Sequence, residues 1–544
     1  MSIYTEPAVG NNFFAREDIL NSLLKSAKGI REEYRHNVAI IGRGLIGKSS
    51  LLLHFLGIVK DYKGLIPVYV SLKDTSFSEF CINYVTALLY HSLRKQTQLK
   101  GDNDLRSLEE IAKDKFPKTC EVIRRIRSLL DEKDYNEAFS ELFNLNTILS
   151  SESGSSIVVV LDEFDILSRF PIRKPFQLLG QKIMIQSKTL FLLSSSSTLT
   201  ARKILSEKLS LLFGGFDIID IEAFTSDQAR EFIKLQCKGI LIPDDLLDFI
   251  ITFTGGHPFY LGSIIHKINS AKRYGINKIT SKHLSQVVAE ILLYPSGAIN
   301  QFFTDLLKRI RPILPEGDIF DILKTVLMKG KASEMTQKLT TGSTQFTNLL
   351  NLLLELGLVS KSGSLYAITD SVFKMWIEVR SKPRNLLFDF IPEEESTDYI
   401  KEAQDRISAF RLEARKSISE KVVELIASFN NEHFFIDERI RMLPHLSFLQ
   451  QKRLNSNTTL IVTRAKKKWL FILSSSRVTE EYICEISKRL KNYQQSKPKI
   501  ILMAMSGLDD TAKVMAKQKH IWIWNREDLN RLFKFYRGYN ALIA

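Results

Sequence analysis

The chain lacks an apolar run of about 18 residues, and it has only four cysteines. Each of these features excludes a class of protein. A helix that crosses a bilayer needs about 20 mostly apolar residues, so we expect no membrane-spanning segment and no membrane partner. The first residues, MSIYTEPAVG, lack the basic and apolar stretches of a secretory signal. The four cysteines are scattered, without a CxxC pair or a Cys/His cluster, which argues against a disulfide framework and structural zinc. These absences predict a cytoplasmic protein.

Long internal repeats and low-complexity tracts are also missing, and the composition is ordinary. The chain is 44% hydrophobic and 25% charged, as soluble globular proteins usually are. Its 544 residues exceed what a single hydrophobic core usually holds. We therefore expect about three domains.

Acidic residues are absent from one long basic stretch. Between Arg439 and Arg477 there are nine lysines and arginines and no aspartate or glutamate. Residues 401–544 carry 27 basic and 15 acidic side chains, so most of the net charge of +15 lies there. The stretch is either a solvated lysine-rich face or a surface for an anionic partner. The missing counter-charge favours nucleic acid, and we expect DNA.

The first half of the chain alternates short apolar runs with helical patterns. Continuous apolar strands separated by helices indicate a parallel sheet covered on both faces, which is an α/β fold. The predicted strands are Val38–Ile41, Leu65–Leu72, Ile157–Leu161, Leu190–Leu193 and Phe216–Ile221.

The second half indicates further domains. Residues 245–300 read as helices, and residues 318–370 read as three short helices followed by a hairpin, which suggests a winged helix. Residues 381–400 contain proline and clustered acids and look like a linker. A helix over 401–428 then opens a second α/β domain. Its strands are expected at 434–440, 458–463, 468–473, 499–505 and 520–524.

A glycine-rich loop lies between the first predicted strand and a helix. The segment Gly42–Ser49 matches GxxxxGK[ST], whose glycines let backbone N–H groups wrap phosphates at a helix N-terminus. In this motif Lys48 reaches the β- and γ-phosphate oxygens, and the Ser49 hydroxyl ligates Mg²⁺. A chance match rarely falls at a strand–helix junction, so the loop predicts binding of ATP and Mg²⁺. The residues expected to bind ATP are Gly42, Gly44, Ile46, Gly47, Lys48, Ser49 and Ser50.

Two carboxylates follow the third predicted strand. Asp162 and Glu163 lie at its carboxyl end, where ligand sites of α/β proteins occur. Asp162 is expected to hold the metal together with Ser49, and Glu163 to act as general base on the attacking water. Acids that end a strand are often merely solvated, but the glycine loop favours the functional interpretation. Ser194, after the next strand, either orients the water or belongs to a plain serine-rich loop.

These motifs resemble those of the archaeal-type ATPase family, a branch of the STAND and AAA+-like P-loop NTPases, from about Phe13 to Trp376. The resemblance implies an ATPase core over 1–235, a helical lid over 236–305 and a winged helix over 306–380. The similar segments are Phe14–Glu17, Gly42–Ser50, Leu161–Phe164, Phe213–Gly214, Thr254–Pro258 and Ile368–Phe373 with Trp376.

The resemblance also implies site roles outside the glycine loop. Phe14 and Arg16 are placed near the adenine, with Pro258 against its other side. Gly215 stands where members often carry an arginine finger. We therefore expect slow basal hydrolysis, with Arg43 or Arg202 as the candidate substitutes.

Beyond Phe429 the chain resembles the restriction-endonuclease-like domain that ends many such ATPases, through the segment Trp522–Asn530. Active members need an Asp and an ExK motif on adjacent strands, but the two expected strands carry no acid. Metal-assisted phosphodiester hydrolysis requires two carboxylates, so the domain over 401–544 is predicted not to cut. Asp437 and Glu438 are interpreted as a surface pair.

The candidate DNA contacts are Arg464, Lys466, Lys467 and Lys468, which precede Trp469. The predicted winged helix has no Lys or Arg in its candidate recognition helix, so contact with DNA and contact with protein both stay open. Our hypothesis is an ATP-binding and hydrolysing switch that controls DNA binding through a non-cleaving domain. The alternatives are a STAND-type signalling or defence ATPase with a protein partner or a homo-oligomer, and an ATP-regulated nuclease.

Overall fold

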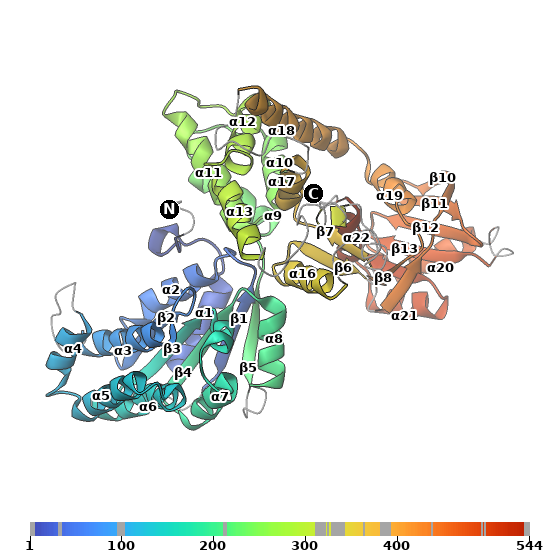
Figure 1. Ribbon diagram of the computed structural model, residues 1–544. Helices are drawn as coiled ribbons and strands as arrows, with labels where there is room; N and C mark the ends of the chain where they lie inside the picture. The colour runs from blue at the N-terminus through green and yellow to red at the C-terminus, as the bar shows by residue number, and fades with distance from the viewer. Residues whose placement is uncertain are drawn as a thin grey trace. The chain divides into compact units, whose positions relative to one another are not determined.

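The computed structural model describes residues 6–30, 35–94, 104–209, 215–310, 323, 326–327, 343–362, 365–380, 393–436, 439–490, 493 and 497–537. The chain folds into two compact units, Met1–Ala223 and Phe224–Ala544 (Figure 1). Among the described residues, no helix combines the length and the apolar character that a bilayer crossing requires.

The first unit is built on a five-stranded sheet in which every neighbouring pair is parallel, in the order β2-β3-β4-β1-β5. Three of its strands are buried along their whole length, which explains their uninterrupted apolar sequences. The predicted parallel sheet and its α/β class are confirmed. The strands are β1 (Asn37–Gly42), β2 (Leu65–Ser71), β3 (Ser156–Asp162), β4 (Thr189–Ser195) and β5 (Phe216–Ile221).

Helices pack on both faces of this sheet. One apolar cluster joins α1 (Glu17–Gly29) and α2 (Lys48–Val59) to alternate strand residues such as Val158, while the next residue, Val159, belongs to the cluster on the opposite face. The helices of the second cluster are α3 (Phe77–Leu93), α4 (Leu105–Ala112), α5 (Pro117–Asp131), α6 (Tyr135–Ser153), α7 (Pro175–Ile185) and α8 (Thr198–Glu207).

The second unit begins with helices, as predicted for residues 245–300. After them come α16 (Ser343–Glu355), the antiparallel hairpin β6 (Val359–Ser362) and β7 (Leu365–Ile368), and α17 (Ser371–Arg380). Most of 311–342, where the first helices of the winged helix are predicted, lies outside the described residues. The initial helices are α9 (Ser226–Gln236), α10 (Asp244–Thr254), α11 (Pro258–Lys272), α12 (Ser281–Leu292) and α13 (Ala298–Ile310).

The C-terminal part of this unit is the second α/β domain that the sequence predicts. Its sheet has the order β10-β11-β12-β13-β14, antiparallel from β10 to β12 and parallel from β12 to β14. The strands are β10 (Ser447–Asn455), β11 (Thr458–Arg464), β12 (Lys468–Ser474), β13 (Lys499–Ala504) and β14 (Trp522–Asn525). The helices around them are α18 (Glu393–Ala414), α19 (Ile418–Ala427), α20 (Glu480–Arg489), α21 (Asp510–Gln518) and α22 (Arg526–Arg537).

Four local features differ from the sequence interpretation. The single helix expected over 401–428 is two helices, α18 and α19, because residues 415–417 leave the helical conformation. The strand expected over 434–440 is a hairpin of β8 (Glu432–Ile436) and β9 (Arg439–Leu443), and Asp437 and Glu438 between them lie outside the described residues. The edge strand β10 was not predicted, because most of its residues are exposed and its middle is polar, so no alternating pattern marks it. Helix α18 starts at Glu393, inside the predicted linker, with the clustered acids at its N-terminal end, which favours helix formation.

Candidate functional site

The strand order brings three chain segments to one edge of the first sheet. Because all five strands are parallel, their carboxyl ends share that edge, and β4 lies between β1 and β3. The register pairs Ser194 with Asp162 on one side and with Ile40 on the other. The glycine loop, the acids at the end of β3 and the serines at the end of β4 therefore meet there, at the position where ligand sites of α/β proteins occur.

The glycine loop is held in a conformation that its glycines permit. A Cβ atom on Gly42 would lie 2.6 Å from the carbonyl oxygen of Ile221 in β5, so a side chain does not fit at this position. Gly47 has φ 101°, which non-glycine residues rarely adopt, and it precedes the first residue of α2. Ile46 is buried, whereas Gly44 has open space around it. The loop thus ends at a helix N-terminus, where backbone N–H groups can bind an anion.

Lys48 is buried within this loop. Its Nζ donates to the carbonyl oxygens of Gly42 at 3.1 Å and Arg43 at 3.2 Å, and lies 3.8 Å from a carboxylate oxygen of Glu163. Burial lowers the pKa of Lys48, and the negative charges of Glu163 and Asp162 oppose that shift. The cation is therefore held among backbone oxygens inside the loop.

Asp162 accepts hydrogen bonds from three hydroxyl groups that come from three different elements. Ser49 of α2 and Tyr69 of β2 each donate to Oδ2 at 2.7 Å, and Ser194 of β4 donates to Oδ1. Burial and the Asp162 charge both raise the pKa of Tyr69 above its ordinary value. The structure therefore brings the two predicted metal ligands, Ser49 and Asp162, into contact. It adds Tyr69, which the sequence analysis did not identify.

Three consecutive serines at the end of β4 and just after it each donate to a different carboxylate. Beyond the bond from Ser194 to Asp162, Ser195 Oγ donates to Asp165 at 2.6 Å. Ser196 donates to Glu163 Oε2 through its backbone N–H at 2.7 Å and its hydroxyl at 2.8 Å.

Glu163 is placed by its own backbone as well as by these donors. It has φ 59°, in the left-handed region that non-glycine residues seldom occupy, so the chain turns sharply after β3. Burial raises its pKa, while the nearby Lys48 and the donors from Ser196 oppose that rise. A strained, partly buried carboxylate with a raised pKa has the features of a general base.

The segment before α1 contacts the glycine loop and α2. Arg16 donates to the carbonyl oxygens of Ile46 at 3.1 Å and Glu222 at 2.7 Å, and burial lowers its pKa to about 10. Arg16 thus connects the loop to the end of β5, and its neighbour Phe14 is partly buried.

Two further contacts extend this N-terminal segment along α2. The hydroxyl of Ser50 accepts from the backbone N–H of Ala8 at 3.0 Å. Phe13 stacks on His54 with ring centroids 4.2 Å apart, an arrangement that the sequence analysis did not identify.

The other predicted site residues make different contacts. Pro258 belongs to the second unit, where it begins α11 beside His257, whose ring stacks on Tyr260. Arg202, a candidate substitute for the arginine finger, forms an ion pair with Asp220 of β5. Gly215 lies in an exposed position before β5, and Phe213 and Gly214 lie outside the described residues.

The predicted DNA contacts form a tight turn between β11 and β12. Arg464, Lys466 and Lys467 are exposed, Lys468 is half-buried, and the backbone N–H of Ala465 donates to the carbonyl oxygen of Lys467 at 3.0 Å. Within the described part of the chain, none of the four cations forms an ion pair. The turn thus presents uncompensated positive charge at one end of the C-terminal sheet.

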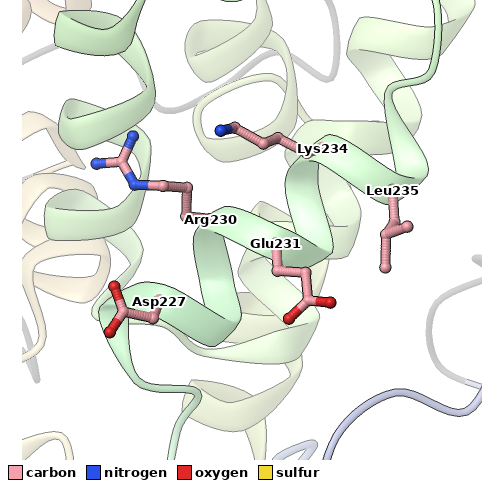
Figure 2. Close-up of a pocket in the computed structure, with 5 residues that line it drawn as sticks. All are labelled: Asp227, Arg230, Glu231, Lys234 and Leu235. Carbon is pink, nitrogen blue, oxygen red and sulfur yellow. The ribbon is translucent and has the colours of Figure 1, made fainter.

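A depression of about 420 Å³ lies over α9 in the second unit (Figure 2). One of its charged lining residues, Arg230, forms ion pairs with Asp244 and Asp248 of α10. Nothing in that lining suggests a reaction, so we take the edge of the first sheet as the candidate site.

The candidate site fits a magnesium nucleotide. Mg²⁺ prefers oxygen ligands and is usually bound by one or two carboxylates together with phosphates, and Asp162 and Ser49 offer such oxygens. Mg²⁺ bound by Asp162 and Ser49 would complete its coordination with phosphate oxygens and water. No group of three or more His, Cys, Asp or Glu suited to a metal occurs among the described residues.

A parallel α/β sheet with a GxxxxGK[ST] loop after one strand and an acidic pair after another is the arrangement typical of P-loop NTPase domains. No protein-family model matches the chain, and no curated protein matches it.

Among solved structures, the chain is similar to the Walker-type ATPase PABY2304 of Pyrococcus abyssi, with 16% identity, a TM-score of 0.45, and coverage of 69% of this chain and 100% of that one. It is similar to the Aeropyrum pernix ORC2 protein at 15% identity and a TM-score of 0.44, over 75% and 97% of the two chains. It is also similar to the Thermotoga maritima RuvB Holliday junction branch migration motor at 15% identity and a TM-score of 0.35, over 68% of this chain and 97% of that one. These likenesses are weak, so the class rests on the strand order and the site.

Proposed function

We propose that this protein binds and hydrolyses ATP and uses the nucleotide state to control DNA binding by its C-terminal α/β domain. The observation that carries the proposal is the convergence of Lys48, Ser49, Asp162 and Glu163 at one sheet edge. Side chains from α2, from the end of β3 and from the residue after it supply a phosphate ligand, a metal site and a base.

The chain's own residues divide the chemistry among them. The loop N–H groups and Lys48 bind the β- and γ-phosphates, and Asp162 with Ser49 holds Mg²⁺. When bound, Mg²⁺ neutralises charge on the phosphate oxygens. Glu163 accepts the proton of the attacking water, and the two donors of Ser196 orient its carboxylate.

Hydrolysis is proposed to be slow in the isolated protein. An arginine finger can raise phosphoryl-transfer rates by about 10³- to 10⁵-fold. Gly215 cannot supply one, and Arg202 is engaged by Asp220. A slow rate suits a switch, because the ATP-bound state then persists long enough to be read by a partner.

The C-terminal domain is the proposed DNA-binding part. Its turn from Arg464 to Lys468 exposes cations without acidic partners among the described residues, which suits binding to phosphates. Strands β11 and β12 carry no Asp or Glu. We therefore propose binding without cleavage.

Helix α18 offers a mechanical connection from the helices of the second unit to this domain. It packs along α12 and α10, and Arg411 donates to Asp245 and to the Ser281 hydroxyl, each at 2.6 Å. Arg406 pairs with Glu378 of α17. Because α19 begins only four residues after α18 ends, movement of the helices would be passed to the C-terminal domain.

The test is DNA binding by the full chain in the apo, ATP-bound and ADP-bound states across a range of salt. Glu163→Gln is the ATP-bound reference, since loss of the base should slow hydrolysis about 10²- to 10⁴-fold while binding persists. The triple variant Lys466→Glu, Lys467→Glu and Lys468→Glu tests the basic turn. A matched control places the same charge change on α21 and just after it, at Lys513, Lys517 and Lys519.

The proposal predicts a steep salt dependence, different affinities in the ATP and ADP states, and loss of binding in the turn variant only. DNA binding that is absent, or that ignores both the nucleotide and the turn, would refute it and direct attention to a protein partner. Metal-dependent cleavage of the DNA would instead show a nuclease.

A further inference from the structure

One face of the C-terminal sheet carries a row of side chains that the basic turn does not include. The register pairs Phe448 with Thr463, Thr463 with Trp469, and Trp469 with Lys499, so this row crosses β10, β11, β12 and β13. Directly paired residues point to the same face of a sheet. With strands about 4.8 Å apart, the row spans about 14 Å from Phe448 to Lys499.

Two cations share one indole ring at the end of this row. Lys499 Nζ lies 3.6 Å from the ring centroid of Trp522, and the guanidinium carbon of Arg441 lies 4.3 Å from it. Trp469 meets Trp522 edge to face at 5.7 Å. The hairpin strand β9 and the starts of β12, β13 and β14 thus bring cations and aromatic rings together, at the end of the sheet where the basic turn also lies.

The two cations of this cluster act on each other electrostatically. Burial and the neighbouring charge of Arg441 both lower the pKa of Lys499, so the two cations repel each other in a partly desolvated place. Lys499 forms no ion pair within the part of the chain that the structure describes. An anion bound here would relieve that repulsion.

The aromatic groups indicate what kind of anion fits. Phe448 is 49% exposed, and Trp469 and Trp522 are only partly buried. The sequence from Arg439 to Arg477, which contains Phe448 and Trp469, has no Asp or Glu. A duplex offers phosphates to cations but keeps its bases stacked inside. An unpaired strand offers both phosphates and base faces, and stacking of a base on an aromatic ring is worth about 1–3 kcal/mol.

We propose that Arg441, Phe448, Trp469, Lys499 and Trp522 form a site for single-stranded DNA, in which the two cations bind phosphate and the exposed ring of Phe448 stacks with a base. This aromatic–cationic cluster rests on the proposed DNA-binding function and specifies its substrate class. Lys452, which pairs with Leu460 and faces the other side of the sheet, lies outside it.

The experiment compares a labelled oligothymidylate with a blunt duplex of equal length, using the full chain with ATP. Phe448→Ala should weaken oligothymidylate binding about 5- to 100-fold and leave duplex binding unchanged, since only the base contact is lost. Its control is Leu449→Ala, because Leu449 is equally exposed, at 47%, but aliphatic. Lys499→Ala should weaken binding and reduce the salt slope by about one phosphate contact, and Lys452→Ala is its control.

Tryptophan fluorescence gives a second readout, because Trp376 and Trp524 are fully buried whereas Trp469 and Trp522 are not. Quenching by oligothymidylate and a preference for it over duplex would support the site. Equal binding of both DNAs, unaffected by Phe448→Ala but abolished in the basic-turn variant, would overturn the site while leaving the proposed function intact. Absence of all DNA binding would overturn both, and binding to anionic phosphatidylserine vesicles in place of DNA would assign the cluster to a lipid surface.

Discussion

Tyr69→Phe is the sharpest test of the metal site, because it removes a single oxygen atom next to Asp162. Tyr69 is one of three hydroxyl donors to that carboxylate, and it shares Oδ2 with Ser49. If Ser49 were to bind Mg²⁺, Tyr69 and Ser194 would still orient the carboxylate. Tyr69 would then act on the metal site through Asp162.

The magnitude follows from the chemistry of that hydrogen bond. A hydrogen bond to a charged group contributes about 1.5–3 kcal/mol, and loss of a group that orients a metal ligand costs about 10- to 100-fold in metal affinity or activity. We expect the Mg²⁺ concentration for half-maximal hydrolysis to rise at least about tenfold in Tyr69→Phe. The rate at saturating Mg²⁺ should fall much less, because Lys48 and Glu163 are unchanged.

The assay is ATP hydrolysis at fixed ATP across a titration of Mg²⁺. Tyr90→Phe is the matched control, since it removes the same atom in the same unit from a tyrosine that does not bond Asp162. An unchanged Mg²⁺ dependence in Tyr69→Phe would refute the argument that this hydroxyl orients the metal ligand.

Three further predictions follow from other parts of the chain. The acidic limb of the pH–rate profile should lie above the pH expected for an ordinary glutamate, because burial raises the pKa of Glu163 and the base must be ionised. Ser196→Ala should move that limb to still higher pH while Ser197→Ala leaves it in place, and a limb that does not move would contradict the assignment. Gly256→Ala should lower the melting temperature of the second unit, because Gly256 has φ 74° and a Cβ there would lie 2.1 Å from the Phe224 carbonyl oxygen. Gly255→Ala is the control: Gly255 also has a positive φ but has open space around it, so this substitution should lower the melting temperature less. Arg411→Ala should leave ATP hydrolysis intact and reduce the difference in DNA affinity between the ATP and ADP states, and a retained difference would exclude α18 as the connection.

Local sequence was sufficient to predict which edge of the sheet holds the candidate site. The apolar runs before Gly42 and Asp162 are buried strands because a parallel sheet covered on both faces tolerates few polar residues. The glycine loop is recognisable because its conformation needs glycine at positions such as Gly47. A residue that directly follows such a strand must lie at the carboxyl edge of the sheet.

The partners of these residues could not be predicted, because hydrogen bonds across a sheet depend on strand order. Tyr69 reaches Asp162 only because β2 lies next to β3, although 93 residues separate the two positions in the chain. The assignment of Ser194 and Ser196 to different carboxylates likewise depends on the register between β3 and β4.

The C-terminal domain shows the same division between sequence and tertiary structure. Its basic stretch, from Arg439 to Arg477, is visible in the sequence because charge is a property of composition. The contact of Arg441 and Lys499 with the ring of Trp522 is not visible in the sequence, because these residues come from three strands that are separated along the chain. Sequence alone determined which classes of chemical group are present, namely a glycine-rich loop, an acidic pair and a basic stretch. Only the tertiary structure decided which side chains share a hydrogen bond, stack on the same ring or lie near another charge, because those contacts depend on packing between distant segments.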